Sequence, residues 1–149
     1  MEWLIGAGGA LVLGLVSAGW ARRNLVAVTV HGQSMNPTLG NGDKVIVRRG
    51  VGGLRRGRIV VVTRPEIETG WARSSPATVA GLGIDRGYIK RAVALGGDAF
   101  PSVVGHSGRV PPNHVVVLGD NPVSTDSKKY GPCPEHQILG VMLWRLSRA

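Results

Sequence analysis

The feature that most constrains this chain is an uncharged, largely apolar run near its N-terminus. Residues 3–20 carry no charged side chain, and Trp3 and Trp20 stand at the two ends. As a helix the run would span roughly 26 Å, close to the ~30 Å thickness of a bilayer core, and indole rings favour the membrane interface. We therefore predict one N-terminal transmembrane helix, with an anchor over residues 1–23 and a second domain over residues 24–149.

Two other interpretations of this run stay open. Residues 16–18 (Val-Ser-Ala) offer the small side chains of a signal-peptide cleavage site, although the run is long for a signal peptide and Glu2 is the only charged residue before it. The run could also be a buried helix of a soluble domain. Arg22 and Arg23 follow it directly, and the positive-inside rule would by itself keep the following domain in the cytoplasm.

Composition excludes some classes of fold and indicates the charge of the partner. One cysteine among 149 residues excludes an intrachain disulfide and a cysteine-based zinc finger. A net charge of +9 favours an anionic partner, either lipid headgroups or nucleic acid. Aromatic residues make up only 5%, which is poor for stacking on bases, so we expect no nucleic-acid partner.

The rest of the chain is predicted to be mainly β. Short runs rich in β-branched residues are separated by Gly and Pro turns, at residues 25–31, 44–48, 59–63, 88–94 and 114–118. A last apolar stretch, 138–146, could be a strand or a short helix. Residues 64–86 show no clean period and indicate a loop. The pattern predicts a mainly β, partly barrel-like domain rather than a parallel doubly wound sheet.

Ser34 is the first candidate for catalysis, because it lies between a β-run and a Pro-containing turn in the block Gly32-Gln-Ser-Met-Asn-Pro-Thr-Leu39. Such a turn can expose a hydroxyl and a free backbone N–H together. The block is not the nucleophile elbow of α/β-hydrolases, because Asn36 stands where that motif needs glycine. Taken alone, Ser34 would be interpreted as an ordinary turn serine.

Lys90 is the second candidate, inside the apolar run Tyr88-Ile-Lys-Arg-Ala-Val-Ala94. In a strand, Tyr88, Lys90 and Ala92 would share one face. A lysine among apolar groups loses solvation, its pKa falls, and its neutral amine becomes available as a base. Ser–Lys pairs are a known variant of nucleophilic catalysis. A solvated edge-strand lysine is the alternative.

The third block, residues 119–131, is dense in short polar side chains that hold turns and could orient an amine. The four histidines lack metal-ligand spacing, and no glycine-rich segment matches a nucleotide-binding fingerprint. We therefore predict no metal and no cofactor.

Taken together, the blocks resemble the type I signal peptidase family, which are membrane-anchored Ser–Lys serine endopeptidases. The resemblance covers roughly residues 25–147. It rests on four blocks in the family's order, which are Ser34-Met-Asn-Pro-Thr-Leu39, Gly42-Asp-Lys-Val-Ile-Val47, Lys90-Arg91 with Gly96-Gly-Asp98, and Gly119-Asp-Asn121 with Ser124, Asp126 and Ser127.

The resemblance implies a role for each matching residue. Ser34 would be the nucleophile, its backbone N–H would donate to the oxyanion, and Lys90 would be the general base. Ser124 would orient the lysine, and Met35 would help to form a shallow substrate pocket. The supporting residues of the last block would be Asp120, Asp126 and Arg91, with Lys128.

The implied activity is removal of N-terminal signal or leader peptides from exported proteins, after small residues, by a serine endopeptidase of the cytoplasmic membrane. The catalytic domain would face the extracytoplasmic side, against the bias of Arg22 and Arg23. Its partners would be precursor proteins and anionic lipid headgroups, the latter near five arginines between residues 48 and 58. Gly32 departs from members that carry a hydroxyl there as a second oxyanion donor. Pro122 and Lys128 also depart from common arginines.

Three alternatives are kept. The protein could be a maturation protease dedicated to a single client. It could be a non-catalytic basic module that binds a membrane surface. A self-cleaving repressor of the related Ser–Lys class would need an N-terminal DNA-binding domain, and the 33 residues before Ser34 are mostly apolar.

Overall fold

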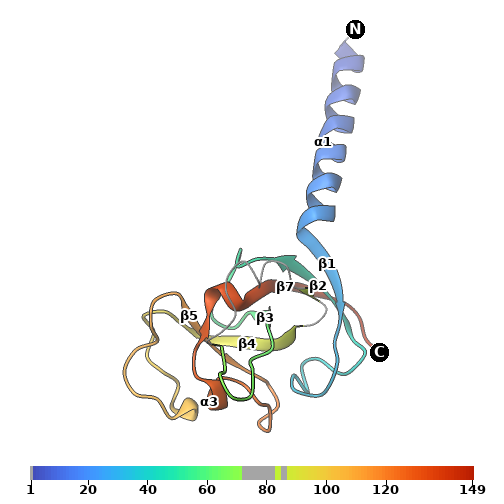
Figure 1. The fold of residues 1–149 in the computed structure, drawn as a ribbon. Coiled ribbons are helices and arrows are strands. Elements are labelled where there is room, and N and C mark those ends of the chain that lie inside the picture. The colour runs from blue at the N-terminus through green and yellow to red at the C-terminus, as the bar shows by residue number, and fades with distance from the viewer. Residues whose placement is uncertain (1, 72–82, 85–86) are drawn as a thin grey trace.

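The N-terminal run forms one long helix. The computed structural model describes residues 2–71, 83–84 and 87–149. Helix α1 extends over Glu2–Asn24 and ends in a basic last turn. It projects away from the strands, which gather at its C-terminal end (Figure 1).

The predicted transmembrane helix needs correction. Over the part of the chain that the structure describes, no helix combines the length and the apolar character that crossing a membrane requires. The uncharged run of α1 stops at Arg22 and Arg23, in the last turn. The expected anchor over residues 1–23 is therefore not confirmed.

The rest of the chain is mainly β, as predicted. The strands are β1 (Leu25–Thr29), β2 (Lys44–Arg49), β3 (Ile59–Val62), β4 (Tyr88–Leu95), β5 (His114–Leu118), β6 (Cys133–Pro134) and β7 (Ile138–Ser147). They form a seven-stranded sheet in the order β1-β2-β7-β3-β4-β5-β6, and every pairing is antiparallel. Three short helices complete the described fold, namely η2 (Ser102–Val104), α3 (Ser127–Tyr130) and η3 (Glu135–Gln137).

The final apolar stretch, which the sequence left open, is a strand at the centre of the sheet. β7 pairs with β3 near its start and with β2 over its later part. Its length of 10 residues lets it bridge the two. β7 therefore joins the β1–β2 pair to the strands that carry Lys90.

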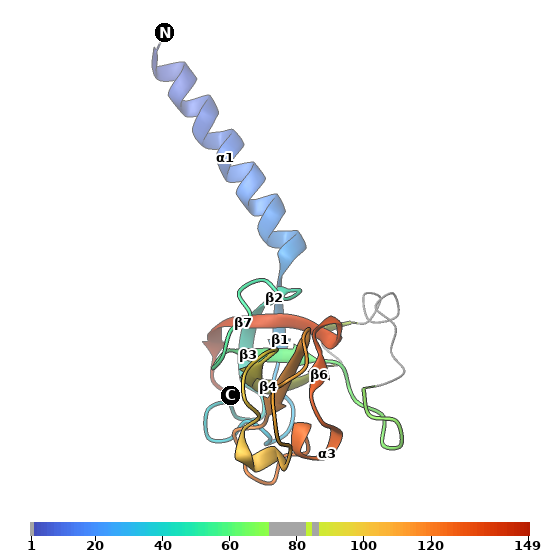
Figure 2. The ribbon, with the colours of Figure 1, turned by 90° about the vertical axis from the view of Figure 1, so that its left-hand side faces the viewer.

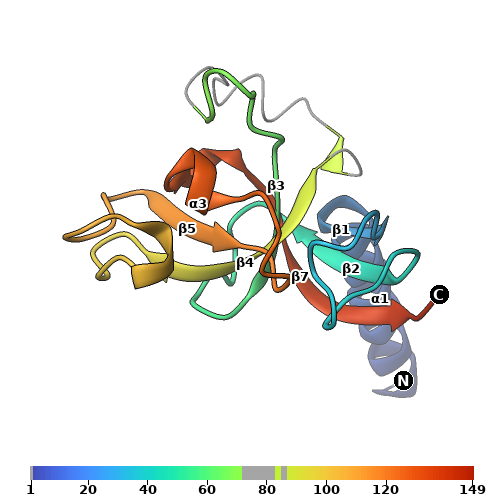
Figure 3. The same ribbon diagram turned by 90° about the horizontal axis from the view of Figure 1, so that it is seen from below.

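The expected partial barrel is not found. β1 and β6 are the two edges of the sheet, and each pairs with one neighbour only. Viewed from below, β1 and β2 lie on one side of the molecule and β5 on the other (Figure 3). β6 has only two residues, which is too short to extend the sheet back toward β1.

The core lies on both faces of β3. Ile59 and Val61 belong to one cluster of buried side chains, and Val60 and Val62 belong to a second. A strand buried on both faces reads as a continuous apolar run rather than an alternating one, which explains the sequence of β3. A third cluster packs the connection between β4 and β5 against these two strands and consists of Ala94, Val104, Val110 and Val116.

The segment 64–86, predicted to be a loop, lies only partly within the described residues. Its first part turns back on itself, because Glu66 and Gly70 exchange both backbone hydrogen bonds. Trp71 is buried and meets the ring of Tyr130 edge-on, with centroids 6.3 Å apart. Residues 72–82 and 85–86 lie outside the described part.

Candidate active site

Ser34 lies in the loop that follows β1. The chain leaves β1 and is tied to the start of β2 by two backbone hydrogen bonds, from Val30 N–H to Asp43 and from Gly42 N–H to Val30, each 2.8 Å long. The Asn41 side chain accepts a hydrogen bond from Gly32 N–H at 2.9 Å. The loop is thus closed at its base, and Ser34 is held half-buried at its tip.

Lys90 comes from β4 and is buried. It pairs with Val60 of β3 and is only 4% exposed. Its Nζ donates a hydrogen bond to the Oγ of Ser124 at 2.5 Å. It also lies over the ring of Tyr88, 5.7 Å from the centroid. The alternation of β4 therefore turns this lysine inward, as the sequence predicted.

The environment of Lys90 favours its neutral form. Burial is the main cause that lowers the pKa of the Lys90 amine, and the positive charge of Lys128 lowers it further. The carboxylate of Asp126 acts in the opposite direction and raises this pKa. Desolvation prevails because the charged ammonium loses water that one hydrogen bond to a hydroxyl does not replace.

The block after β5 positions Ser124 through a network of backbone contacts. The buried carboxylate of Asp126 accepts hydrogen bonds from Gly119 N–H at 2.8 Å and from Lys128 N–H at 3.1 Å. Ser127, also buried, accepts one from Val117 N–H at 2.9 Å. These short polar side chains tie the turn to the end of β5, so that Ser124 is presented to β4.

The Ser34 loop and this block are in direct contact. Asn121 donates a backbone hydrogen bond to the carbonyl of Ser34 at 3.0 Å and a side-chain bond to the carbonyl of Gln33 at 3.1 Å. Gly119 lies where they meet, and a Cβ there would overlap both the Ser34 carbonyl and the Ser124 side chain. A glycine is therefore required at position 119 for the close approach.

Arg91 and Asp120 form an ion pair that joins β4 to the segment after β5. The guanidinium binds the carboxylate through two hydrogen bonds, of 2.8 and 2.6 Å, and also donates to the Gly57 carbonyl at 2.7 Å. The Arg91 bond is the main cause that holds the pKa of Asp120 below its ordinary value, with a further hydrogen bond from Thr38. Bidentate pairs of this kind fix orientation as well as distance.

Ser34 and Lys90 line one cleft of about 470 Å³. The other lining residues are His31, Gly32, Gln33, Ile67, Tyr88, Thr125, Lys129 and Tyr130. Sequence reasoning assigned no role to Tyr88, Lys129 or Tyr130. Tyr88 precedes Lys90 by two residues, so their shared strand face was the available signal, whereas Lys129 and Tyr130 enter through the turn of α3.

Other expected site residues lie elsewhere. Met35 is 1% exposed and packs in the core cluster beside β1 and β2, away from the cleft lining. Its role as a pocket residue stays a prediction. Within residues 2–71, 83–84 and 87–149, no group of three or more His, Cys, Asp or Glu side chains is arranged to hold a metal ion.

The chemistry that this arrangement can support is hydrolysis. A hydroxyl and a desolvated amine that share one cleft can support nucleophilic attack and proton transfer without a histidine.

Comparison with known proteins places the chain in a family. The family model described as "Signal peptidase, peptidase S26" matches residues 2–100 and 98–146. The chain is 34% identical over 128 residues to mitochondrial inner membrane protease subunit 1 of Mus musculus, covering 80% of this chain and 68% of the relative. It is 28% identical over 174 aligned positions to signal peptidase IB of Staphylococcus aureus (strain COL), covering 97% and 88%.

A third relative is the mitochondrial ATP-independent inner membrane protease subunit 1a of Arabidopsis thaliana, 36% identical over 130 residues, with 83% of this chain and 72% of the relative covered. This chain therefore belongs to the signal peptidase family, peptidase S26, and is a protease.

Proposed function

We propose that this protein is a serine endopeptidase that removes N-terminal signal or leader peptides from exported precursor proteins after small residues. Family membership supports the substrate class. The observation that carries the mechanism is the burial of Lys90, whose Nζ bonds Ser124 in the cleft that Ser34 also lines.

In this proposal Lys90 Nζ, in its neutral form, takes the proton from Ser34 Oγ while the oxygen attacks the scissile carbonyl carbon. The C=O π electrons move to the oxygen, giving a tetrahedral oxyanion. As that oxyanion collapses, the C–N bond breaks and the leaving amine takes the proton from Lys90. A water then loses a proton to Lys90 and attacks the acyl ester carbon. As this second tetrahedral intermediate collapses, the bond from the carbon to Ser34 Oγ breaks and Oγ takes the proton from Lys90, which restores both groups.

The backbone N–H of Ser34 is the proposed oxyanion donor. In the described part of the chain, this N–H has no hydrogen-bond acceptor, so it is free for a substrate oxygen. Gly32 offers no side-chain hydroxyl as a second donor. Since one such donor contributes about 10²–10³ in rate, we propose that a second backbone N–H of this loop replaces it.

An extended substrate can pair with strand edges beside the cleft. β1 is an edge strand that leads into the Ser34 loop. Residues 88–90 of β4 pair with β3, and among the described residues they have no strand on their other side. Addition of a substrate strand would bring its carbonyl to Ser34 by main-chain hydrogen bonds. Met35 would then support the pocket indirectly, by packing in the core beneath the Ser34 loop.

We further propose that the protein works at a membrane, where exported precursors are found. Whether it serves one client or many is a separate question, and N-terminal proteomics of exported proteins after gene deletion answers it. One altered N-terminus would indicate a dedicated maturation protease, whereas many would indicate a general peptidase.

Cleavage in detergent of an exported precursor, with Ala one and three residues before the cut, tests the mechanism. Ser34→Ala and Lys90→Met should each lose at least about 10³-fold in activity, because the nucleophile and its base take part in the same step and removal of either one stops it. Ser107→Ala and Lys44→Met are matched controls at exposed positions. Full activity of Lys90→Met would disprove the dyad, and an inactive wild type on several precursors would argue against a general signal peptidase.

A further inference from the structure

The proposed catalysis leaves a strongly basic segment unused. Residues 44–65 contain seven Lys or Arg side chains and no acidic one. These side chains belong to β2, to the loop between β2 and β3, and to the residues around β3. Such a one-sided charge needs a partner of opposite charge or a fully solvated surface.

The middle of this segment lies at the end of the domain from which α1 projects. The tip of β2 and the β2–β3 loop are on that side in two perpendicular views (Figures 1 and 2). The Arg48 guanidinium lies over the ring of Trp20, 5.8 Å from its centroid, and also lies against Gly52. The loop is thus joined to the last turns of α1, where Arg22 and Arg23 add two more cations.

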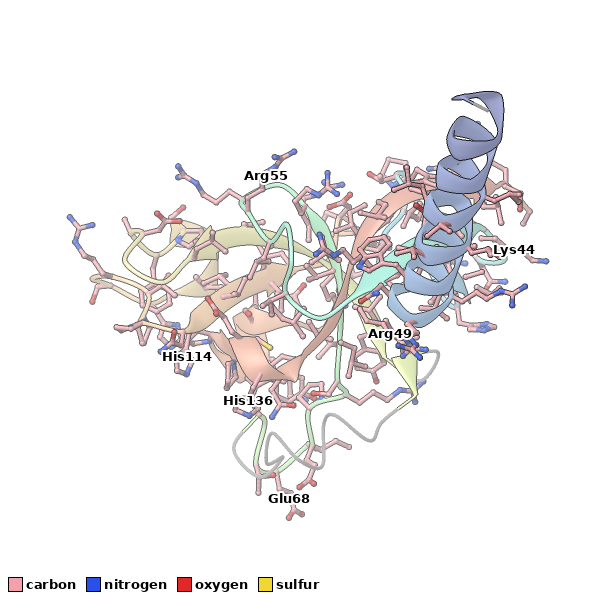
Figure 4. The ribbon with its side chains drawn as sticks, turned by 90° about the horizontal axis from the view of Figure 1, so that it is seen from above. Lys44, Arg49, Arg55, Glu68, His114 and His136 are labelled. Atoms are coloured by element: carbon pink, nitrogen blue, oxygen red, sulfur yellow. The ribbon has the colours of Figure 1, made fainter. Side chains whose placement is uncertain are left out.

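The exposed arginines of this region form what we call the basic face. Its members are Arg22, Arg23, Arg49, Arg55 and Arg56, with Arg48 behind them. Figure 4, viewed from the α1 side, shows Arg55 at the outer edge of the domain and Arg49 beside α1. Among the residues that the structure describes, only Arg56 of this face has an acidic neighbour, since Asp98 lies 3.7 Å away, and the Arg56 side chain is still 69% exposed. The charges of the basic face are therefore available.

Apolar side chains adjoin the same face. Val51, between Arg49 and Arg55 in the loop, is 44% exposed. Leu11, Leu13 and Leu15 of α1 are about 70% exposed, and the intervening Val12 is 60% exposed. Exposed apolar surface of this extent beside clustered cations is the composition of a lipid-binding surface. Nucleic acid would match the arginines but would leave the leucines uncovered.

We propose that the basic face binds anionic phospholipid headgroups, while α1 contacts the apolar part of the same lipid. The negative potential of an anionic leaflet attracts each nearby arginine, and Val51 would enter between headgroups. β1 then leads away from α1 to the Ser34 loop (Figure 1), and at ~3.4 Å per residue its 5 residues extend about 17 Å. Docking would hold the cleft at a set distance from the lipid.

Binding of the full-length protein to vesicles tests this inference. The triple variant Arg49→Gln, Arg55→Gln, Arg56→Gln is compared with wild type on phosphatidylglycerol-containing and on pure phosphatidylcholine vesicles. A control triple variant, Lys44→Gln, Arg109→Gln, Arg148→Gln, removes the same charge at exposed positions elsewhere. The contribution of α1 is common to all three proteins. Thermal unfolding in detergent checks that each variant is folded.

We expect the basic-face variant to lose roughly 100-fold in affinity for the anionic vesicles, about fivefold for each arginine. The loss should shrink when salt is raised to about 0.5 M, because exposed charges are then screened. The control variant should lose much less, and neither should change on phosphatidylcholine. Equal losses in both variants, or no loss in either, would overturn the inference. A larger loss on single-stranded RNA than on anionic vesicles would overturn it in favour of nucleic acid.

Peptidase activity on a soluble peptide in detergent should be the same in all three proteins. Failure of the lipid proposal is thereby separated from failure of the catalytic one. Hydrogen exchange gives a second measure. Amides of residues 49–57 should be protected when the full chain is bound to anionic nanodiscs, and not when it is bound to zwitterionic ones.

Discussion

The Nζ of Lys90 lies 2.5 Å from the Oγ of Ser124, and this contact joins β4 to the block that follows β5. Ser124 is 34 residues away in sequence, yet its hydroxyl accepts a hydrogen bond from the buried amine. The same block bonds the Ser34 carbonyl through Asn121. The segment that follows β5 therefore contacts both Lys90, through Ser124, and the Ser34 loop, through Asn121.

Removal of this hydroxyl should impair catalysis more than substrate binding. Lys90 becomes an ammonium as it takes the proton, and hydrogen bonds to charged groups contribute about 1.5–3 kcal/mol. For Ser124→Ala we therefore expect kcat to fall about 10–100-fold, with KM little changed. Ser124→Thr keeps the hydroxyl and should recover part of the activity. Steady-state kinetics on a peptide substrate measures both. A change in KM alone would indicate that Ser124 contacts substrate instead of positioning Lys90.

Lys128 and Lys129 offer a matched pair for testing the charge state of Lys90. The Lys128 charge lowers the pKa of Lys90, whereas Lys129 is not among the causes of that shift. Catalysis needs the neutral amine, so activity rises with pH through the pKa of Lys90. Lys128→Met should raise that pKa and move the acid limb of kcat/KM to higher pH, whereas Lys129→Met should leave the limb in place. Equal shifts in both variants would contradict this electrostatic origin.

The sequence predicted the positions of the strands correctly, but it did not predict that the sheet stays open instead of closing into a partial barrel. The runs at 44–48, 59–63 and 114–118 correspond to β2, β3 and β5 within a residue or so, because β-branched residues between glycine turns are a local signal. The two-residue β6 was missed, since so short a strand has no period. The open sheet was missed for a related reason, because edges depend on which distant strands pair.

Within the site, the sequence predicted the inward position of Lys90, because alternation along β4 is local. The contact with Ser124 could be expected only from the family resemblance, since no local pattern links positions 34 residues apart. The bidentate bond between Arg91 and Asp120 is long-range in the same way. Burial of Met35 could not be predicted, because residues in a turn show no hydrophobic periodicity that would indicate which side chains face the core.

Gly119 should tolerate no side chain. A methyl group there would overlap the Ser34 carbonyl and the Ser124 hydroxyl together, so Gly119→Ala must push apart the two segments that form the site. Overpacking costs about 1–3 kcal/mol, and we expect a larger proportional loss of activity than of stability. Gly40→Ala is the matched control, because its Cβ would meet nothing within 4 Å. Peptide cleavage and thermal unfolding in detergent measure the two effects, and an active Gly119→Ala would show that the block can shift without harm.

The Arg91–Asp120 pair should make stability depend on pH in acid. Arg91 lowers the pKa of Asp120 in the folded protein, so the carboxylate stabilises the fold above the unfolded pKa near ~3.9. That contribution is lost as pH falls through the lower folded pKa. At neutral pH, Asp120→Asn should unfold about 2–8 °C lower, for a loss of about 1–2 kcal/mol.

The difference between Asp120→Asn and wild type should shrink as the pH falls below about 4, because the carboxylate of the unfolded chain then binds a proton while the folded one, with its lower pKa, still resists protonation. Glu68→Gln, an exposed acidic position in the loop before Trp71 (Figure 4), is the control and should match wild type throughout. Thermal unfolding in detergent across this pH range gives the comparison. A difference that stays constant down to the lowest pH would show that Asp120 stabilises the block through shape or neutral hydrogen bonds, and that its charge contributes nothing.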